Sequence, residues 1–308
     1  MKYNIKFLSS FILVLTILSI NVSFCQQEIL LTKYTYNSLF FNPAYAGSHG
    51  DGIGTANIQY RNQWIGFAGA PTTLIAGGEI NLFKDKVGLG VTIYNENIGV
   101  ERRNEIATNY AYRIQLNKGY LCGGLRLGMS FFSNDFTTAN AETPESNFNS
   151  YNVISGGAGL YYHTNGLYIG ASVPTLFVAS KSKSIGDRVP HLYFHTGLMI
   201  GDEYSTVKVE PSLLINAQKS VKPQFNFGAN VWFSNDFAVG AHWRSEDAVA
   251  LSSEIHFMEN FKFGIAYDFT TSAIRNHSSG SLEAMFGYKF ARNKNNPRIK
   301  NIRYGGRF

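Results

Sequence analysis

The chain has 308 residues, of which 16% are charged and 15% aromatic, with 30 Gly and only 8 Pro. This aromatic content excludes a disordered chain. Part of the net charge of +6 lies in the N-terminal leader and part in the C-terminal tail, and no nucleic-acid-binding motif is present, so nucleic acid is not an expected partner. The composition instead favours a long antiparallel sheet with a different solvent on each face.

Residues 1–25 have the features of a cleaved signal peptide. Lys2 and Lys6 precede an apolar run, 7–20, which is short for a transmembrane helix. Cleavage is expected before Gln26. Processing as a lipoprotein at Cys25 is an alternative, although the bulky Phe24 disfavours it. The sequence therefore predicts an exported protein.

We expect the mature chain to start at Gln26 and to carry no lipid. The reason is the order of the leader, a positive segment followed by an apolar run and small residues before the cut. The intact mass of protein extracted from membranes tests this. A diacylglyceryl group on Cys25, or a retained leader, would contradict it.

Residues 26–51 are interpreted as a periplasmic N-terminal segment that leads into the first strand. No long unbroken apolar stretch follows Ile20, so a helical membrane protein is not expected. If cleavage removes Cys25, Cys122 is the remaining cysteine, and neither an intrachain disulfide nor a cysteine-based metal site is predicted.

From residue 52 to residue 291 apolar and polar residues alternate, which places them on opposite faces of strands. In one segment, aromatic and aliphatic residues occupy the odd positions from Phe261 to Phe269, and polar or small residues fill the even ones. The pattern predicts a single all-β domain, an antiparallel transmembrane β-barrel of about 14 strands. The predicted strand cores are 52–62, 72–83, 85–96, 101–116, 119–133, 150–163, 165–173, 190–201, 205–216, 222–234, 236–245, 248–258, 260–270 and 281–291.

The charges of these strands fall on the non-aromatic face. They are Arg61, Glu79, Arg113, Arg126, Lys208, Glu210, Arg244, Glu254, Lys262, Asp268, Glu283 and Lys289. A soluble β-sandwich also alternates, but a lipid-facing surface excludes charge, because a midplane Lys or Arg costs about 2–4 kcal/mol there. The charge-free aromatic face therefore favours a membrane barrel, in which the charges face the lumen.

The connections between the predicted strands alternate in length. Longer ones, notably 134–149, 174–189 and 271–280, follow every second strand, as in barrels with short periplasmic turns and long external loops. The even strand count puts both termini on the periplasmic side. Pro211 is a local misfit inside a strand. The basic tail, 292–308, is predicted to be a solvated periplasmic extension, with a docking role as the alternative.

No arrangement of residues predicts catalysis, a cofactor or a metal ion. His191 and His195 share one strand face but would lie about 13 Å apart, too far to chelate one ion. No Gly-x-Ser-x-Gly or His-Glu-x-x-His motif occurs. Paired glycines inside strands, such as Gly123-Gly124 and Gly156-Gly157, indicate that bulky neighbours or curvature need room.

Two short segments resemble a known family. The first is 41–47, Phe-Asn-Pro-Ala-Tyr-Ala-Gly, and the second is 61–72, which contains Arg-Asn-Gln-Trp and Gly-Ala-Pro-Thr. Together they are similar to the PorP/SprF family of Bacteroidetes type IX secretion membrane proteins. The resemblance implies an outer-membrane barrel of the secretion or gliding machinery that binds or anchors a secreted surface adhesin or cargo protein, with periplasmic secretion components as further partners.

The partner-binding residues that the resemblance suggests are Asn42, Pro43, Tyr45, Gly47, Arg61, Gln63, Trp64 and Pro71. A purely structural role is the alternative for both segments: a turn at Pro43 and an aromatic girdle residue at Trp64. The alternative function is a passive outer-membrane porin for small solutes. The mixed signs of the predicted lumen charges do not favour a selective pore.

Overall fold

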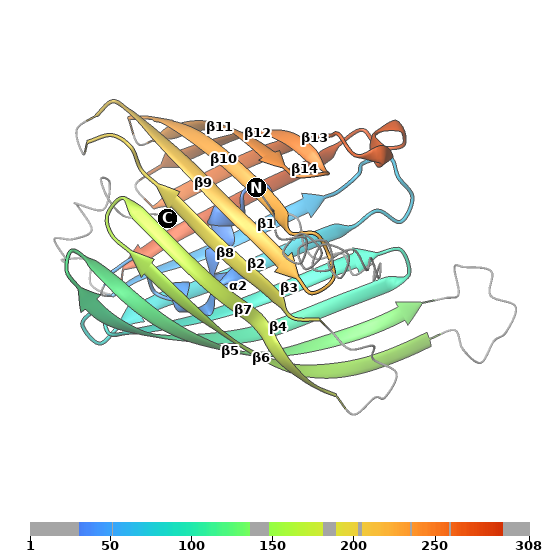
Figure 1. Cartoon of the computed structure of the whole chain (residues 1–308), viewed down its shortest axis with the longest axis horizontal. Coiled ribbons are helices and arrows are strands. Elements are labelled where there is room, and N and C mark those ends of the chain that lie inside the picture. The colour runs from blue at the N-terminus through green and yellow to red at the C-terminus, as the bar shows by residue number, and fades with distance from the viewer. Residues whose placement is uncertain are drawn as a thin grey trace, which may run out of the picture.

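The computed structural model describes residues 31–50, 52–135, 148–180, 189–202, 205–234, 236–258 and 260–291. Strands run antiparallel around a closed barrel of 14 strands, each paired with its neighbours in the sequence, and the first strand closes on the last (Figure 1). The predicted fold class and strand number are confirmed. The signal peptide, the segment 136–147 and the tail after residue 291 lie outside the described residues.

The strands agree closely with the predicted cores. They are β1 (Ile53–Asn62), β2 (Thr72–Leu82), β3 (Val87–Ile98), β4 (Glu101–Leu116), β5 (Gly119–Asp135), β6 (Phe148–His163), β7 (Leu167–Ser180), β8 (His191–Leu198), β9 (Val207–Gln218), β10 (Gln224–Phe233), β11 (Phe237–Arg244), β12 (Ala248–Phe257), β13 (Phe261–Thr270) and β14 (Ser281–Ala291). A short 3₁₀ helix, η5 (Ala273–Asn276), lies between β13 and β14.

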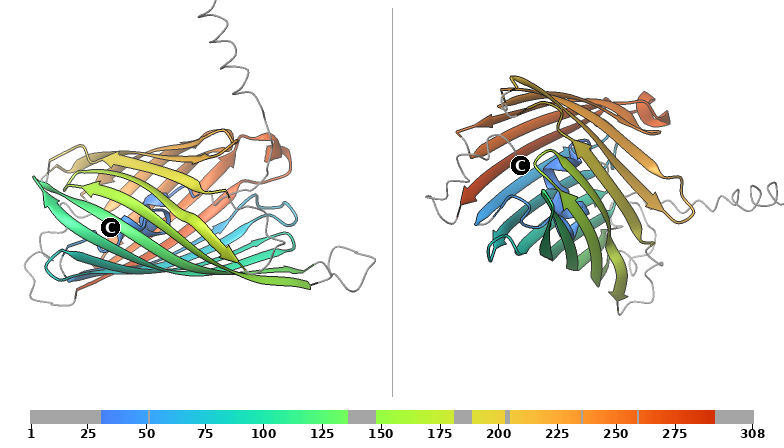
Figure 2. Two further views of the ribbon diagram at one scale, coloured as in Figure 1. Left: turned by 60° about the horizontal axis from the view of Figure 1, so that its bottom comes forward. Right: turned by 60° about the vertical axis from the view of Figure 1, so that its left-hand side comes forward.

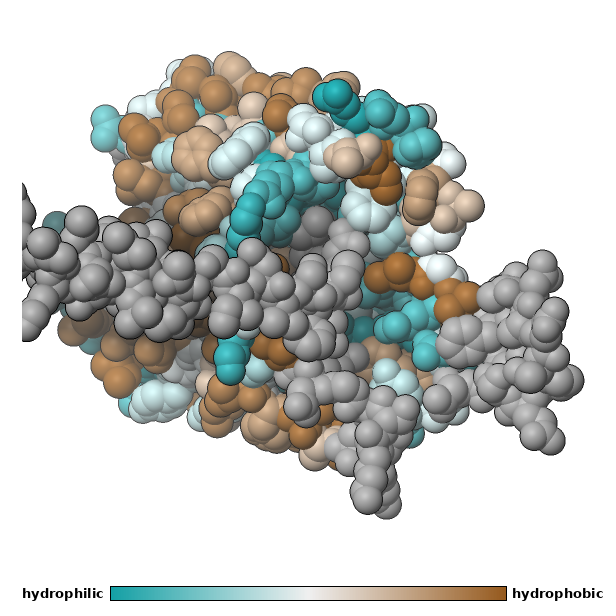
Figure 3. Space-filling view, turned by 45° about the vertical axis from the view of Figure 1, so that its right-hand side comes forward, coloured by the Kyte–Doolittle hydropathy of each residue, from teal (hydrophilic) through white to brown (hydrophobic). Residues whose placement is uncertain are grey.

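Strand geometry sorts the side chains as the alternation predicts. All twelve predicted lumen charges are buried inside the barrel, whereas large apolar residues such as Leu125, Phe227 and Trp243 are exposed on its outside. Brown, hydrophobic side chains cover much of the flank in Figure 3, and teal, hydrophilic ones gather toward the end turned to the viewer. Closure satisfies the backbone groups of the strands, as a wall in lipid requires.

Two local features differ from the predicted strands. β7 continues past residue 173 to Ser180, because a bulge around Pro174 absorbs the irregularity and pairing with β6 resumes at Phe177. Pro211 pairs in register with Ala229 of β10, and the interruption falls on the other side of β9, where the ladder with β8 stops at Ser212. A proline donates no backbone hydrogen bond, so one side of its strand loses the ladder.

The largest difference concerns the N-terminal segment. Residues 31–49, here called the plug, lie inside the lumen as η1 (Tyr34–Asn37), α2 (Ser38–Phe41) and η2 (Pro43–Tyr45), the blue segment within the barrel in Figure 2. The interpretation of 26–51 as a periplasmic segment is therefore wrong for these residues. The aromatic side chains of the plug bury apolar surface in the lumen that they would expose to water in the periplasm.

Candidate functional site: a lumen filled by the plug

The plug crosses the barrel from one end to the other. The connections β1–β2, β5–β6, β7–β8 and β13–β14 mark one end, here called the loop end, and the short turns such as 117–118 and 164–166 mark the other, the turn end. The Leu31 carbonyl accepts a hydrogen bond from Asn226, near the loop end of β10, whereas Gly47 contacts Asn81, near the turn end of β2. The chain therefore runs through the lumen before it enters β1.

An ionic latch holds the start of the plug at the loop end. It consists of Thr32 and four wall residues, Arg61, Arg244, Asp268 and Glu283. The Thr32 backbone N–H donates to Glu283 at 2.7 Å, and its hydroxyl donates to Asp268 at 2.6 Å. Arg61 pairs with both carboxylates, at 2.8 Å to Asp268, and Arg244 also pairs with Asp268. All five residues are buried, so these charge-assisted bonds are shielded from water.

The next residues of the plug are held by charge as well. The Lys33 ammonium lies 3.1 Å from a Glu254 carboxylate oxygen and 3.1 Å from the Asn230 side-chain oxygen. The Lys262 ammonium sits 3.8 Å from the centre of the Tyr36 ring, a cation–π contact.

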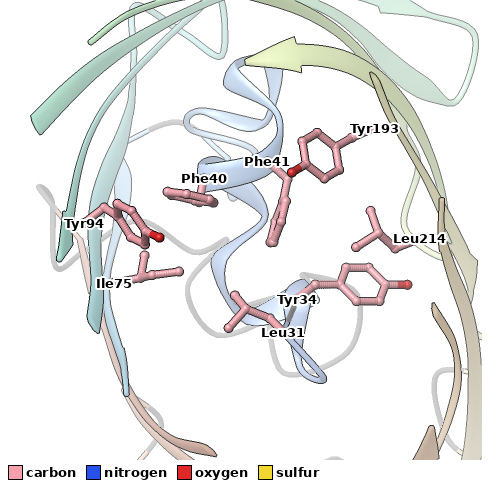
Figure 4. Close-up of a cluster of buried hydrophobic side chains, with 8 residues drawn as sticks. All are labelled: Leu31, Tyr34, Phe40, Phe41, Ile75, Tyr94, Tyr193 and Leu214. Carbon is pink, nitrogen blue, oxygen red and sulfur yellow. The ribbon is translucent and has the colours of Figure 1, made fainter. Parts of the chain in front are cut away.

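An apolar cluster packs the middle of the plug against the wall. Figure 4 shows plug residues pointing outward to side chains on opposite sides of the lumen. Phe40 lies against Tyr94 with ring centroids 5.4 Å apart, and Phe41 meets Tyr193 edge-on at 5.2 Å. Full burial of such a side chain contributes about 1.5–3 kcal/mol. The plug is therefore packed like a protein core.

The first family segment, 41–47, forms the half of the plug that is nearer the turn end. The Asn42 side chain donates to the Leu160 carbonyl, lies 3.0 Å from the His195 ring nitrogen, and caps the turn that starts at Pro43 by accepting from the Ala44 N–H. An asparagine supplies the donor and the acceptor that this position needs. Its role is to fix the plug to β6 and β8.

Carboxylate and guanidinium groups hold the plug where it turns toward β1. The Gly47 N–H donates to Glu79 at 2.8 Å, and the His49 ring lies 2.9 Å from the other oxygen of that carboxylate. Arg113 donates to the Ala46 carbonyl. Gly47 has φ of +68°, a conformation that glycine adopts without strain. The turn end of the plug is thus bonded to β2 and β4.

Inward-facing glycines make room for the plug. A Cβ at Gly88 or Gly124 would collide with the backbone of Ala46 or Ala44, and a Cβ at Gly159 would collide with the Asn42 side chain. At Gly156 the space is instead taken by the Phe177 ring on the outer face. The inference that these paired glycines make room for neighbours is confirmed at Gly124, Gly156 and Gly157, whereas at Gly123 the nearest side chain, Leu160, is 3.9 Å away.

The second family segment joins two loops at the loop end. The Gln63 N–H donates to the Pro71 carbonyl at 3.0 Å, which closes the β1–β2 connection. The Trp64 N–H donates to the Ser281 hydroxyl at 3.1 Å, and the Ile65 N–H donates to the Gly280 carbonyl at 2.7 Å. This segment ties the first loop to the start of β14, next to the latch.

The structure places the two family segments toward opposite ends of the barrel and not in one exposed binding surface. Among the proposed partner-binding residues, Asn42, Pro43, Tyr45, Gly47, Arg61, Gln63 and Pro71 are buried. The first four of these residues belong to the plug inside the barrel. Partner contact at these residues stays a prediction, and of the eight residues Trp64 alone is partly exposed.

Sequence reasoning missed the plug, although signals for it are present. Residues 34–45 contain five aromatic side chains and no charge, a composition that suits a core better than a periplasmic linker. A second signal is the set of glycines at inward positions of β3, β5, β6 and β7. The alternation of apolar and polar residues could not show which residues pack against these glycines.

Within the part of the chain that the structure describes, no three His, Cys, Asp or Glu side chains are arranged to hold a metal ion. His191 and His195 bind separate partners, Asn216 and Asn42. Among the same residues, no helix has the length and apolar character to cross a membrane.

A closed antiparallel barrel with an apolar outside, a charged interior and a lumen filled by its own chain defines an outer-membrane protein. The family of type IX secretion system membrane proteins, PorP/SprF, matches residues 23–288, and the chain belongs to this family.

The fold has distant neighbours among solved structures. The monoaromatic hydrocarbon channel CymD is 11% identical, with a TM-score of 0.51 over 85% of this chain and 94% of that one. Omp33 of Acinetobacter baumannii is 8% identical, with a TM-score of 0.43 over 79% of this chain and 99% of that one. No curated protein matches this chain. Identities this low show similarity of fold alone.

Proposed function

We propose that this protein binds or anchors a secreted surface protein, an adhesin or other cargo, as a cargo-specific outer-membrane component of type IX secretion or gliding. It works by binding and not by catalysis. Its membership of the PorP/SprF family supports a role in type IX secretion. The loops at the loop end, exposed on the outside of the cell, receive the partner, and periplasmic secretion components are a second class of partner at the turn end.

The observation that carries this proposal is the filled lumen. A 14-strand barrel lies between the small barrels filled by side chains and the 16–18-strand porins that keep an aqueous channel. Here the plug occupies the interior and bonds to at least six strands around it, including β2, β4, β6, β10, β13 and β14. Such a barrel suits binding at its ends better than passage of solutes, and this weighs against the porin alternative.

Deleting the gene should remove one or a few secreted proteins from the cell surface and leave the uptake of small solutes unchanged. The reason is that a closed lumen contributes no diffusion path. Mass spectrometry of peptides released by protease from intact cells measures the first effect, and uptake of a labelled sugar measures the second. If uptake falls while every secreted protein keeps its surface abundance, the porin alternative is right.

A further inference from the structure

We propose that the outer wall of the barrel binds a membrane lipid with an anionic, phosphate-bearing headgroup. One acyl chain lies in an open groove over β1 and β2, and the headgroup contacts Arg102 and neighbouring asparagines at the loop end of β3 and β4. These surfaces lie outside the barrel, so the proposal rests neither on the plug nor on the proposed function.

The groove is the first observation. It has a volume of about 290 Å³. Its floor is low because small residues face outward where β1 and β2 pair: Ala56 lies opposite Gly78, and Ala76 lies opposite Ile58. Larger side chains of the neighbouring strands border it, namely Phe286 and Tyr288 of β14 and Val91 and Ile93 of β3. An acyl chain suits this groove, because it brings no polar group that would need a hydrogen bond there.

The polar end of the same wall is the second observation. The outward positions of β4 from Ile106 to Leu116 are apolar or aromatic except for Thr108, and this span matches the roughly 9–11 residues of a tilted membrane strand. Polar residues begin directly beyond it. The Asn95 side chain of β3 donates to the Asn104 side-chain oxygen of β4 at 2.7 Å. This pair therefore marks the level at which the hydrocarbon ends and the headgroups begin.

Arg102 supplies the charge at this level. It is the next outward residue of β4 beyond Asn104, lies opposite Asn97 of β3, and has an exposed side chain. Among the described residues, no carboxylate pairs with it. A guanidinium can meet two phosphate oxygens with two parallel N–H donors. Charge complementarity therefore favours an anionic headgroup, and the asparagine side chains beside Arg102 offer it further polar contacts.

The groove and the polar end lie within reach of one lipid. On β3, Ile93 borders the groove, and Asn97 lies four residues further along the strand, opposite Arg102. Four strand residues span roughly 13 Å, a distance that an acyl chain crosses. A second copy of this chain is the competing occupant. An apolar protein wall would offer Arg102 no negative charge, whereas a phosphate does, so the lipid fits both parts of the site.

Native mass spectrometry of the full-length protein in detergent tests the proposal with two lipids that share their acyl chains, dioleoyl phosphatidylglycerol and dioleoyl phosphatidylcholine. A single phosphatidylglycerol adduct should be several-fold more abundant than the phosphatidylcholine adduct, because the choline cation offsets the phosphate charge. Arg102→Gln should lower the phosphatidylglycerol adduct to the phosphatidylcholine level. Gly78→Leu should lower both several-fold by filling the groove, and a Cβ at Gly78 meets its nearest neighbour only at 3.8 Å, so the barrel can accept it.

Two matched variants are the controls. Gly123→Leu adds the same side chain to the outer wall on β5, and Lys222→Gln removes one positive charge at the loop end between β9 and β10. Both should retain the lipid, and migration of unheated protein in detergent gels shows that each variant is folded. Equal adducts of the two lipids, or an unchanged phosphatidylglycerol adduct in either Arg102→Gln or Gly78→Leu, indicate annular lipid only and overturn the proposal. A dimer that Gly78→Leu abolishes also overturns it, because a second copy then occupies the groove.

Discussion

Gly124→Val should convert the closed barrel into an open pore. A Cβ at Gly124 would overlap the backbone of Ala44 and Pro43, and backbone atoms cannot move aside by a change of rotamer. Overpacking of this kind typically costs about 1–3 kcal/mol even where side chains can yield. We expect the plug to leave the lumen. The conductance of the purified barrel in planar bilayers should then rise by an order of magnitude or more, because the empty lumen of a barrel with this number of strands holds water.

The neighbouring glycine supplies the control. Gly123 faces outward on the same strand, and a Cβ there would meet only the Leu160 side chain, at 3.9 Å. Gly123→Val should therefore keep the low conductance of the natural protein. Migration of unheated protein in detergent gels shows whether each variant still forms a closed barrel. A folded Gly124→Val barrel with unchanged conductance would show that the plug does not seal the lumen.

Arg61→Ala should cause a large loss of stability at the loop end. It leaves the buried carboxylates of Asp268 and Glu283 without their shared counter-ion, although Arg244 still pairs with Asp268. Removing one partner of a buried ion pair costs about 3–5 kcal/mol. The expected result is a fall of that size in the free energy of unfolding, measured by urea titration in detergent. Protease should also cut near Thr32 more readily than in the natural protein.

Two further variants test whether the loss of stability comes from the buried charges. Glu283→Gln in the Arg61→Ala background should recover part of the loss, because it removes one orphaned charge and keeps an acceptor for the Thr32 N–H. Lys222→Ala breaks the exposed pair with Glu246 and should change the free energy of unfolding by less than about 1 kcal/mol. If Arg61→Ala is as mild as Lys222→Ala, the latch does not hold the plug.

The sequence alone determined the strands that form the barrel wall and the face on which each of their residues lies. Alternation has a period of two, so the same pattern that identifies a strand also says which face each residue occupies. Lipid tolerates no charge on one of these faces, which made the placement of residues such as Glu79 and Lys262 predictable. Strand ends were less certain where proline intervenes, and β7 beyond Pro174 was taken for a loop, because a bulge depends on the neighbouring strand.

Only the tertiary structure decided what fills the lumen. The 3₁₀ and helical turns of the plug are too short to show a periodicity of their own, and their bonds join residues far apart in the sequence, such as Thr32 with Glu283. Local pattern carries no information on such pairs. The family segment 41–47 was therefore recognised from its residues but assigned to partner binding. Its place inside the barrel depends on inward-facing glycines and lumen charges from different strands. These residues come close to one another only when the sheet closes.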